Sequence, residues 1–479
     1  MSTVSVDQRP LADVEQAVVL SAKSPAMDGA AYPVLTLPHE ITSEIFLHCL
    51  PPLPELSSDA KNGPNASLAP LLLLRICRTW RNVALSTPHL WVHLHLILAD
   101  LPMDLDEVEL ERRVVDWFYR TGSCSLSFSV ALGSPFVDGF AAEAIRAIVR
   151  RHAPRLQTIS LQLEKTHFVR LASISGPFPA LENLSLALPF NTGESGDASE
   201  MRALKPFLTA PRLHQLSYGD RARPRMFSLP YERLSKVTCD ALSGDEFLDL
   251  IHGATFLQEL ICSVNREAIH FHTVPITHNH LRILCLIYNS STDFVRFLCL
   301  PTLEKLHLSL DVPDPPANLN FLAFLARSSV SLRRFSTATK ITMLTIDWFA
   351  TAMPNLTEIE LYSPHRSFFQ YLFAALDRTE HSGFLPLLRA LSFVDTSFDV
   401  TQPMVQALSS RCSTMRDQGS ALESFQLIWP RGFTTESLNL KEPIVVALRG
   451  LAEKGMLIHI GPAWKNSVWL ARRGEKIPR

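Results

Sequence analysis

One pattern of apolar and polar positions recurs along most of this 479-residue chain. It is x-P-x-L-x-x-Φ-x-Φ, with Φ apolar, and it is clear in segments such as FPALENLSL and LPTLEKLHL. Alternation in the LxxLxL core predicts a short strand with one buried row, because successive strand side chains point to opposite faces. The first leucines of the eleven instances are Leu156, Leu181, Leu213, Leu234, Leu257, Leu281, Leu303, Leu332, Leu356, Leu388 and Leu422.

The period of this pattern indicates a repeat architecture. Ten intervals span 266 residues, about 27 each, which is within the leucine-rich-repeat range. Intervening segments such as 245–253 and 320–328 have helical spacing. We therefore predict an α/β solenoid with one strand and one helix per repeat and with strands lining the concave face. No Asn or Cys ladder follows the LxL core, so curvature could be irregular, and an ordinary α/β domain with parallel strands is the alternative.

Proline marks the repeat boundaries. The chain has 33 prolines and only 18 glycines, the reverse of ordinary usage. We expect a proline two residues before the first leucine to end the preceding helix and to set an extended entry into the strand. The prolines at this position are Pro154, Pro179, Pro211, Pro301, Pro354 and Pro386.

Two short apolar segments precede the repeats. The first predicts a helix that begins at Pro38, with an apolar stripe through Ile41 and Ile45, and that Pro51 stops. The second spans 71–91 and ends after Pro88. In it we expect one shared helical face for Leu73, Ile76, Cys77 and Trp80.

The ordered motifs LPHEITSEIFLHCLP and LLLLRICRTWRNVALSTPHLW resemble the F-box of many fungal proteins, a three-helix module of about 45 residues. The resemblance implies docking on the Skp adaptor of cullin-RING ubiquitin ligases. It implies these adaptor-binding residues: Leu37, Pro38, Ile41, Ile45, Phe46, Leu50, Pro51, Ile76, Cys77, Trp80, Arg81, Leu90 and Trp91. The connection between the two motifs is longer than usual, which we interpret as a surface loop. A helical hairpin that merely caps the next domain is the alternative.

Composition narrows the classes of protein. With 47% hydrophobic residues, 19% charged residues and a net charge of −2, the chain is neither a disordered polyelectrolyte nor a general nucleic-acid binder. It has no apolar run of the roughly 20 residues that a membrane helix needs, and its N-terminus is unlike a secretory signal. The eight cysteines form no CxxC pair. We interpret them as reduced core residues and therefore expect a cytoplasmic or nuclear protein.

Motifs for catalysis are missing. The sequence contains no P-loop, GxSxG or HExxH, and its carboxylates are not paired informatively. Three histidine pairs lack further metal ligands at recognisable spacing, so we interpret them as solvent-facing strand residues. They are His93-x-His95, His270-x-His272 and His278-x-His280. We expect no catalytic residue, metal or cofactor, and no enzyme activity of its own.

Strand alternation also predicts two columns of outward side chains across the array. The first column is Thr158, Asn183, Gln215, Lys236, Glu259, Ile283, Lys305, Arg334, Glu358, Ala390 and Ser424. The second column is Ser160, Ser185, Ser217, Thr238, Ile261, Cys285, His307, Ser336, Glu360, Ser392 and Gln426.

An apolar spot interrupts these mostly polar columns. Its residues are Ile261, Ile283 and Cys285, and a basic flank of Lys305, His307 and Arg334 follows it. We hypothesise a target-binding patch here, since exposed contiguous apolar surface marks interfaces. The alternative is that the C-terminal tail or a long loop covers it.

These expectations combine into one interpretation. The resemblance implies a non-catalytic substrate receptor that binds a Skp-type adaptor, through it a cullin, and an unknown target protein, with no nucleic-acid or membrane partner. Two alternatives are an F-box adaptor or scaffold that assembles no ligase, and an enzyme whose site is built across repeats. The expected division is 1–32 disordered leader, 33–95 F-box with a loop insertion at 54–69, 96–152 linker and N-terminal capping repeats, 153–430 solenoid, and 431–479 C-terminal cap and tail.

Overall fold

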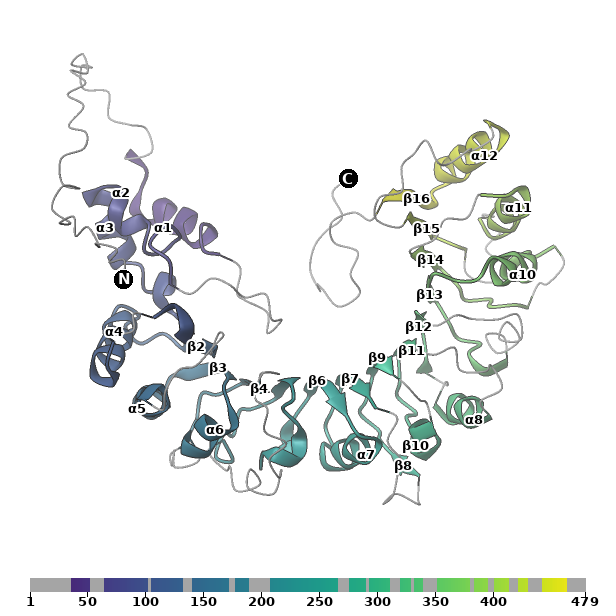
Figure 1. Cartoon of the computed structure of the whole chain (residues 1–479). Helices are drawn as coiled ribbons and strands as arrows, with labels where there is room; N and C mark the ends of the chain where they lie inside the picture. The colour runs from purple at the N-terminus through teal and green to yellow at the C-terminus, as the bar shows by residue number, and fades with distance from the viewer. Residues whose placement is uncertain are drawn as a thin grey trace, which may run out of the picture.

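The computed structural model shows one open arc with strands on its inner side and helices on its outer side (Figure 1). A small group of helices lies at the N-terminal end of the arc. The structure describes residues 36–51, 64–101, 105–131, 140–171, 177–188, 207–265, 275–289, 293–310, 319–328, 331–338, 351–379, 383–394, 400–412, 421–429 and 442–462. The predicted leader and residues 54–63 of the predicted loop lie outside these ranges, while 64–69 form turns and bends.

The N-terminal group contains α1 (His39–His48), α2 (Leu73–Ile76), α3 (Arg78–Leu85) and the 3₁₀ turn η2 (Pro88–Trp91). Helix α1 begins one residue later than predicted, so that Pro38 is its N-cap residue. The expectation of one shared face in the second segment is wrong, because Cys77 is extended (φ −157°, ψ 171°) and separates α2 from α3. The Cys77 sulfur instead caps α3 by accepting the Trp80 backbone N–H at 3.4 Å.

A 14-stranded sheet forms the spine of the arc, and every neighbouring pair in it is parallel. Its strands are β1 (His93–Ile97), β2 (Leu126–Ala131), β3 (Leu156–Gln162), β4 (Asn183–Leu188), β5 (Gln215–Asp220), β6 (Lys236–Leu242), β7 (Glu259–Val264), β9 (Ile283–Asn289), β11 (Lys305–Leu310), β12 (Arg334–Thr337), β13 (Glu358–Tyr362), β14 (Ala390–Val394), β15 (Ser424–Trp429) and β16 (Leu457–Pro462). Strand order follows chain order, as in a leucine-rich-repeat solenoid. The sheet also continues beyond residues 153–430, through β1 and β2 at one end and β16 at the other.

The connections between strands vary more than the predicted single helix per repeat. The α-helices are α4 (Glu107–Tyr119), α5 (Phe140–His152), α6 (Lys165–Leu171), α7 (Gly244–Gly253), α8 (Leu319–Ser328), α10 (Arg366–Leu376), α11 (Gln402–Arg411) and α12 (Glu442–Glu453). The 3₁₀ turn η3 (Leu98–Asp100) precedes α4 in the same connection. In the described parts of other connections, short elements replace a helix: η5 (Pro224–Met226), η6 (Tyr231–Arg233), η7 (Asp293–Phe297), and the paired strands β8 (Ile276–Thr277) and β10 (Leu298–Cys299). The outer side of the arc is therefore irregular, whereas the inner sheet is uniform.

The leucines of the repeat form one continuous core. All eleven predicted first leucines are at most 3% exposed, and the apolar residues that follow them on each strand are buried in the same cluster. The prolines act through a tight turn that the sequence argument did not specify. The Leu181 N–H donates to the carbonyl of Phe178, directly before Pro179, and Leu303 repeats this bond to Leu300. Proline suits the second position of such a turn because its φ is fixed.

One buried arginine joins two neighbouring repeats. Arg411, at the end of α11, is 1% exposed. Its guanidinium donates to the carbonyls of Leu376 (2.7 Å) and Leu385 (2.8 Å) and to that of Phe384. These carbonyls lie at the end of α10 and in the loop that leads to β14. Burial lowers the pKa of Arg411 to about 10, so the side chain stays charged at neutral pH.

We predict that Arg411→Met will lower stability by ~2–4 kcal/mol, because it leaves buried carbonyls without a donor. Urea unfolding followed by circular dichroism measures this loss. Arg449→Met on α12, where the side chain is exposed, is the matched control and should change stability by less than about 0.5 kcal/mol. Equal midpoints for the two variants would contradict a joining role for Arg411.

Candidate interaction surfaces

The N-terminal helices enclose a small aromatic core. The Phe46 side chain is buried and its ring lies 5.0 Å from that of Trp80. Two hydroxyl contacts tie α1 to the end of α3: His39 Nε2 lies 2.8 Å from Ser86 Oγ, and Ser43 Oγ lies 3.0 Å from Thr87 Oγ1. The helices therefore form a packed unit without help from a partner chain.

The residues predicted to bind an adaptor divide into two groups. Phe46, Leu90 and Trp91 are buried and hold the helices together. Ile41, Ile45 and Ile76 are instead 51%, 42% and 50% exposed. The remaining members are exposed at Leu37, Pro38, Pro51 and Arg81, and partly buried at Leu50, Cys77 and Trp80. Two further exposed leucines, Leu72 and Leu85, were not identified from the sequence. The sequence pattern predicted one continuous helix through Cys77, and a helical wheel drawn for that helix puts these side chains on the wrong face.

A hollow of about 450 Å³ lies between α1 and α3 on this unit. Leu37, His39 and Trp80 are among the residues that line it. Leu37, which is 38% exposed, lines this hollow, whereas Ile41, Ile45 and Ile76 do not. Large exposed aliphatic side chains next to a hollow are typical of a protein-binding surface.

Trp91 fixes the helical unit to the first repeat. Its buried indole N–H donates to the Ala84 carbonyl of α3 at 2.9 Å, and its own carbonyl accepts the Trp117 indole N–H of α4 at 2.8 Å. The two indole rings meet edge to face at 4.9 Å, and the Arg120 guanidinium lies 4.5 Å above the Trp91 ring. Since β1 follows directly and joins the sheet, unit and solenoid share one core.

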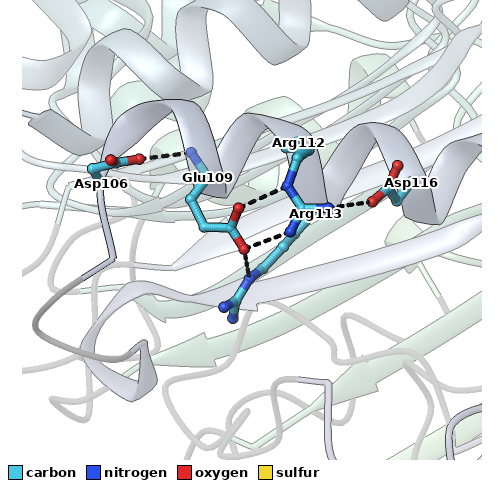
Figure 2. Close-up of polar contacts among 5 residues, drawn as sticks. All are labelled: Asp106, Glu109, Arg112, Arg113 and Asp116. Carbon is cyan, nitrogen blue, oxygen red and sulfur yellow. Dashed lines mark hydrogen bonds and ion pairs between the residues drawn. The ribbon is translucent and has the colours of Figure 1, made fainter.

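The charges on α4 neutralise one another along the helix. Figure 2 shows Glu109 accepting hydrogen bonds from Arg112 and Arg113, each at 2.7 Å, while Arg112 also reaches Asp116 at 3.0 Å. Hydrogen bonds from the two arginines, Arg112 first, lower the pKa of Glu109 to about 2. Asp106 caps the helix by accepting the Glu109 N–H. Consecutive arginines on this helix thus give no basic patch for nucleic acid.

Both predicted columns exist on the concave face. Thr158, Asn183 and Gln215 are in register on neighbouring strands, as are Ser160, Ser185 and Ser217. The register continues through every later member of both columns. The first column ends on β16 at Leu457 and the second at His459. The sequence pattern therefore predicted the register of this face. The expectation that every member points outward is wrong for Ser185 and Ser336, which are buried.

The predicted apolar spot is present but differently composed. Ile261 and Ile283 are half-buried on β7 and β9, and Ile287 of β9, which was not predicted, lies on the same face at the same level of exposure. Cys285 is only 3% exposed, so the expectation that it forms part of the surface is wrong. Its short side chain sits in register between the longer Ile261 and His307.

The basic flank carries less positive charge than predicted. Arg334 forms an ion pair of 2.8 Å with Glu358 on the next strand. Burial lowers the pKa of His307 to about 4, so this imidazole is neutral at pH 7. The flank has three predicted cations, Lys305, His307 and Arg334. Of these, Arg334 is paired and His307 is neutral, so these two add no net positive charge. Pairing between strands 24 residues apart in sequence could not be read from the pattern.

Three side chains form a hydrogen-bonded chain across neighbouring repeats. His307 Nδ1 lies 2.9 Å from Ser336 Oγ, and the Ser336 hydroxyl donates to Glu360 Oε2 at 3.3 Å. In a Ser-His-acid triad the histidine lies between the other two. Here the serine is in the middle and its proton points to the carboxylate, so this order does not activate it as a nucleophile.

The described histidine pairs are only partly solvent-facing: His93 and His280 are exposed, whereas His95 is half-buried with its Nδ1 2.9 Å from Ser129 Oγ. His278 is buried, donates from Nε2 to the Ala254 carbonyl at 2.9 Å, and accepts backbone N–H groups at Nδ1. The expectation that it faces solvent is therefore wrong. His270 and His272 lie outside the described residues. In the described ranges, no group of three or more His, Cys, Asp or Glu side chains could hold a metal ion, and no helix is long and apolar enough to cross a membrane.

Comparisons with known proteins add little beyond the fold itself. No family model matches the chain, and no curated protein matches it. Among solved structures it resembles an internalin from Listeria monocytogenes, with a TM-score of 0.33 and 12% sequence identity over 78% of this chain and 83% of that one. The assignment to a leucine-rich-repeat type of solenoid thus rests on the observed strand ladder and its buried leucines.

We predict that Cys285 will resist alkylation in the native protein. Burial raises the pKa of its thiol to about 12, and the thiolate is the reactive form. Treatment with iodoacetamide at pH 8, followed by peptide mass spectrometry, should modify the exposed Cys49 at least about tenfold faster. Comparable rates would show that the concave face is open at Cys285.

Proposed function

We propose that this chain is a non-catalytic substrate receptor of a Skp–cullin–F-box ubiquitin ligase. Residues 36–91 would bind a Skp-type adaptor as an F-box, and the solenoid would bind a target protein. The chain would contribute proximity, since holding a target near the conjugating enzyme raises the effective concentration of its lysines. Bond making and breaking would belong to the partners.

The observation that carries the proposal is the exposed aliphatic surface on the helical unit. Ile41, Ile45 and Ile76 remain open although Phe46 and Trp91 already complete the core beneath them. A helical hairpin that only capped the solenoid would turn such residues inward. The F-box resemblance, which requires a partner on this surface, accounts for their exposure.

A second observation supports the receptor role. The unit is joined to the solenoid through Trp91 and Trp117 without an intervening linker. A bound target would therefore be held at a fixed distance from the adaptor. The half-buried Ile261 and Ile283 on the concave face are the proposed target contacts.

We predict that Ile41→Glu combined with Ile45→Glu will abolish retention of the adaptor while the solenoid stays folded. Both side chains are exposed, so the charges cost little in the free chain but would be buried in a complex. Affinity purification from cells with quantitative mass spectrometry measures Skp and cullin together. Val446→Glu, at an exposed position on α12, is the matched control and should retain both.

The same purification separates the proposal from its rival. Recovery of Skp without cullin by the wild type would favour the adaptor or scaffold that assembles no ligase. Failure of the wild type to retain any Skp adaptor would overturn the F-box assignment.

We also predict that Ile261→Asp combined with Ile283→Asp will remove bound target proteins without affecting the adaptor. Neither isoleucine is fully buried, so unfolding is not expected, and thermal melting checks this. Val169→Asp on the outer helix α6 is the control, since its side chain is exposed on the opposite side of the arc. A target profile that does not change would eliminate this patch as the binding site.

A further inference from the structure

A carboxyl group without a cation lies on the concave face beyond the apolar spot. Glu360, on β13, accepts hydrogen bonds from the Ser336 and Tyr362 hydroxyls and is largely buried. In the described part of the chain no lysine or arginine pairs with it, because the nearby Arg334 is taken by Glu358 at 2.8 Å. A desolvated carboxylate is costly unless a positive charge accompanies it.

A second polar atom beside Glu360 also lacks a partner. Ser392, the register neighbour of Glu360 on β14, has a buried Oγ with no hydrogen-bond partner. Buried hydroxyls are normally satisfied, so an orphan hydroxyl next to an uncompensated carboxyl is a place where an added hydrogen-bond donor would be stabilised. An ammonium or guanidinium between the two residues would donate to both.

We propose that the concave face binds an extended segment in which an aliphatic residue and a lysine or arginine are separated by four to six positions. The aliphatic side chain would lie on Ile261, Ile283 and Ile287, and the cation would lie between Glu360 and Ser392. This inference rests on the proposed function, because it specifies the target that the receptor would recognise.

The spacing follows from the strand ladder. Three strand steps separate β9 from β13, and four separate β7 from β13. At about 4.8 Å per step these are roughly 14 and 19 Å. An extended chain that crosses the strands advances about 3.3 Å per residue. The two anchor residues should therefore lie four to six positions apart in the bound segment.

Ion pairs flank the apolar centre, and Lys305 lies on β11 between the two anchors. Lys236 pairs with Glu259 at 3.1 Å on one side of the isoleucines, and Arg334 pairs with Glu358 on the other. The dominant features for a partner are thus an apolar centre and one separate acidic site. Opposite charge at the second site provides specificity beyond simple apolar burial.

Protonation of Glu360 should govern the affinity. Burial raises the pKa of this carboxyl to about 7, so it is mostly neutral at pH 6 and mostly ionised at pH 8. A cation prefers the ionised form, and affinity should therefore rise about tenfold between these values. Burial lowers the pKa of the neighbouring His307 to about 4 and raises the pKa of Tyr362, and Ser336 and Ser392 do not titrate. Glu358 forms an ion pair with Arg334.

Selection from a random 12-residue peptide display library on the full-length protein tests the proposal. The enriched peptides should share an aliphatic residue and a lysine or arginine at the stated separation. Fluorescence anisotropy with one such synthetic peptide should show at least a tenfold loss of affinity in Glu360→Gln at pH 8. That variant should also lose the pH dependence, while Glu453→Gln on α12 behaves as the wild type.

The outcomes separate this inference from the proposed function. Enriched peptides that lack a basic residue, or that bind Glu360→Gln as tightly as the wild type, would overturn the cation site but leave the apolar patch. An absence of peptides that prefer the wild type over the Ile261→Asp, Ile283→Asp variant would overturn the patch itself. Thermal melting confirms folding of Glu360→Gln, and the pH profile of the wild type tests the site without any substitution.

Discussion

No repeat of this chain can bury its own leucines, and the rest of the structure depends on that constraint. Each strand has only five to seven residues along most of the sheet and offers one apolar row, which solvent would reach if the strand stood alone. Parallel stacking in a fixed register places every row against the next, so first leucines such as Leu156 and Leu388 become fully buried. Stability is therefore shared between neighbours, as in other repeat proteins.

The same constraint explains how the two candidate surfaces relate. The leucines of each strand form the core, and the side chains that alternate with them form the concave face. The residue types on the concave face can therefore vary without changing the core. Most of these are polar, and some pair across strands, as Lys236 does with Glu259. The isoleucines on β7 and β9 and the carboxyl of Glu360 are the departures. At the other end, the helical unit adds Phe46 and Trp91 to the same core and keeps Ile41 and Ile45 outside it.

Much of the solenoid could be predicted because its rule is local. Alternation along each strand determined both concave columns, and the positions of Pro179 and Pro301 marked the entry to a strand. What could not be predicted involves contacts between repeats or single backbone torsions. The extended Cys77 divides an apparently continuous helix, Cys285 disappears beneath longer neighbours, and Glu358 neutralises Arg334. Glu360 belongs to a predicted column, but only the lack of a paired cation distinguishes it from the other members. That lack is visible only in the three-dimensional structure.

The uniform register has a consequence for how such a chain can change during evolution. Duplicating or deleting one whole repeat leaves every local strand contact intact, since each strand meets a neighbour of the same kind. The effect is a change of about one strand spacing, roughly 4.8 Å, in the path between Trp91 and the concave isoleucines. The number of repeats therefore sets the distance between Trp91 and the concave isoleucines. A change in repeat number could match this distance to the size of a partner without altering either candidate surface.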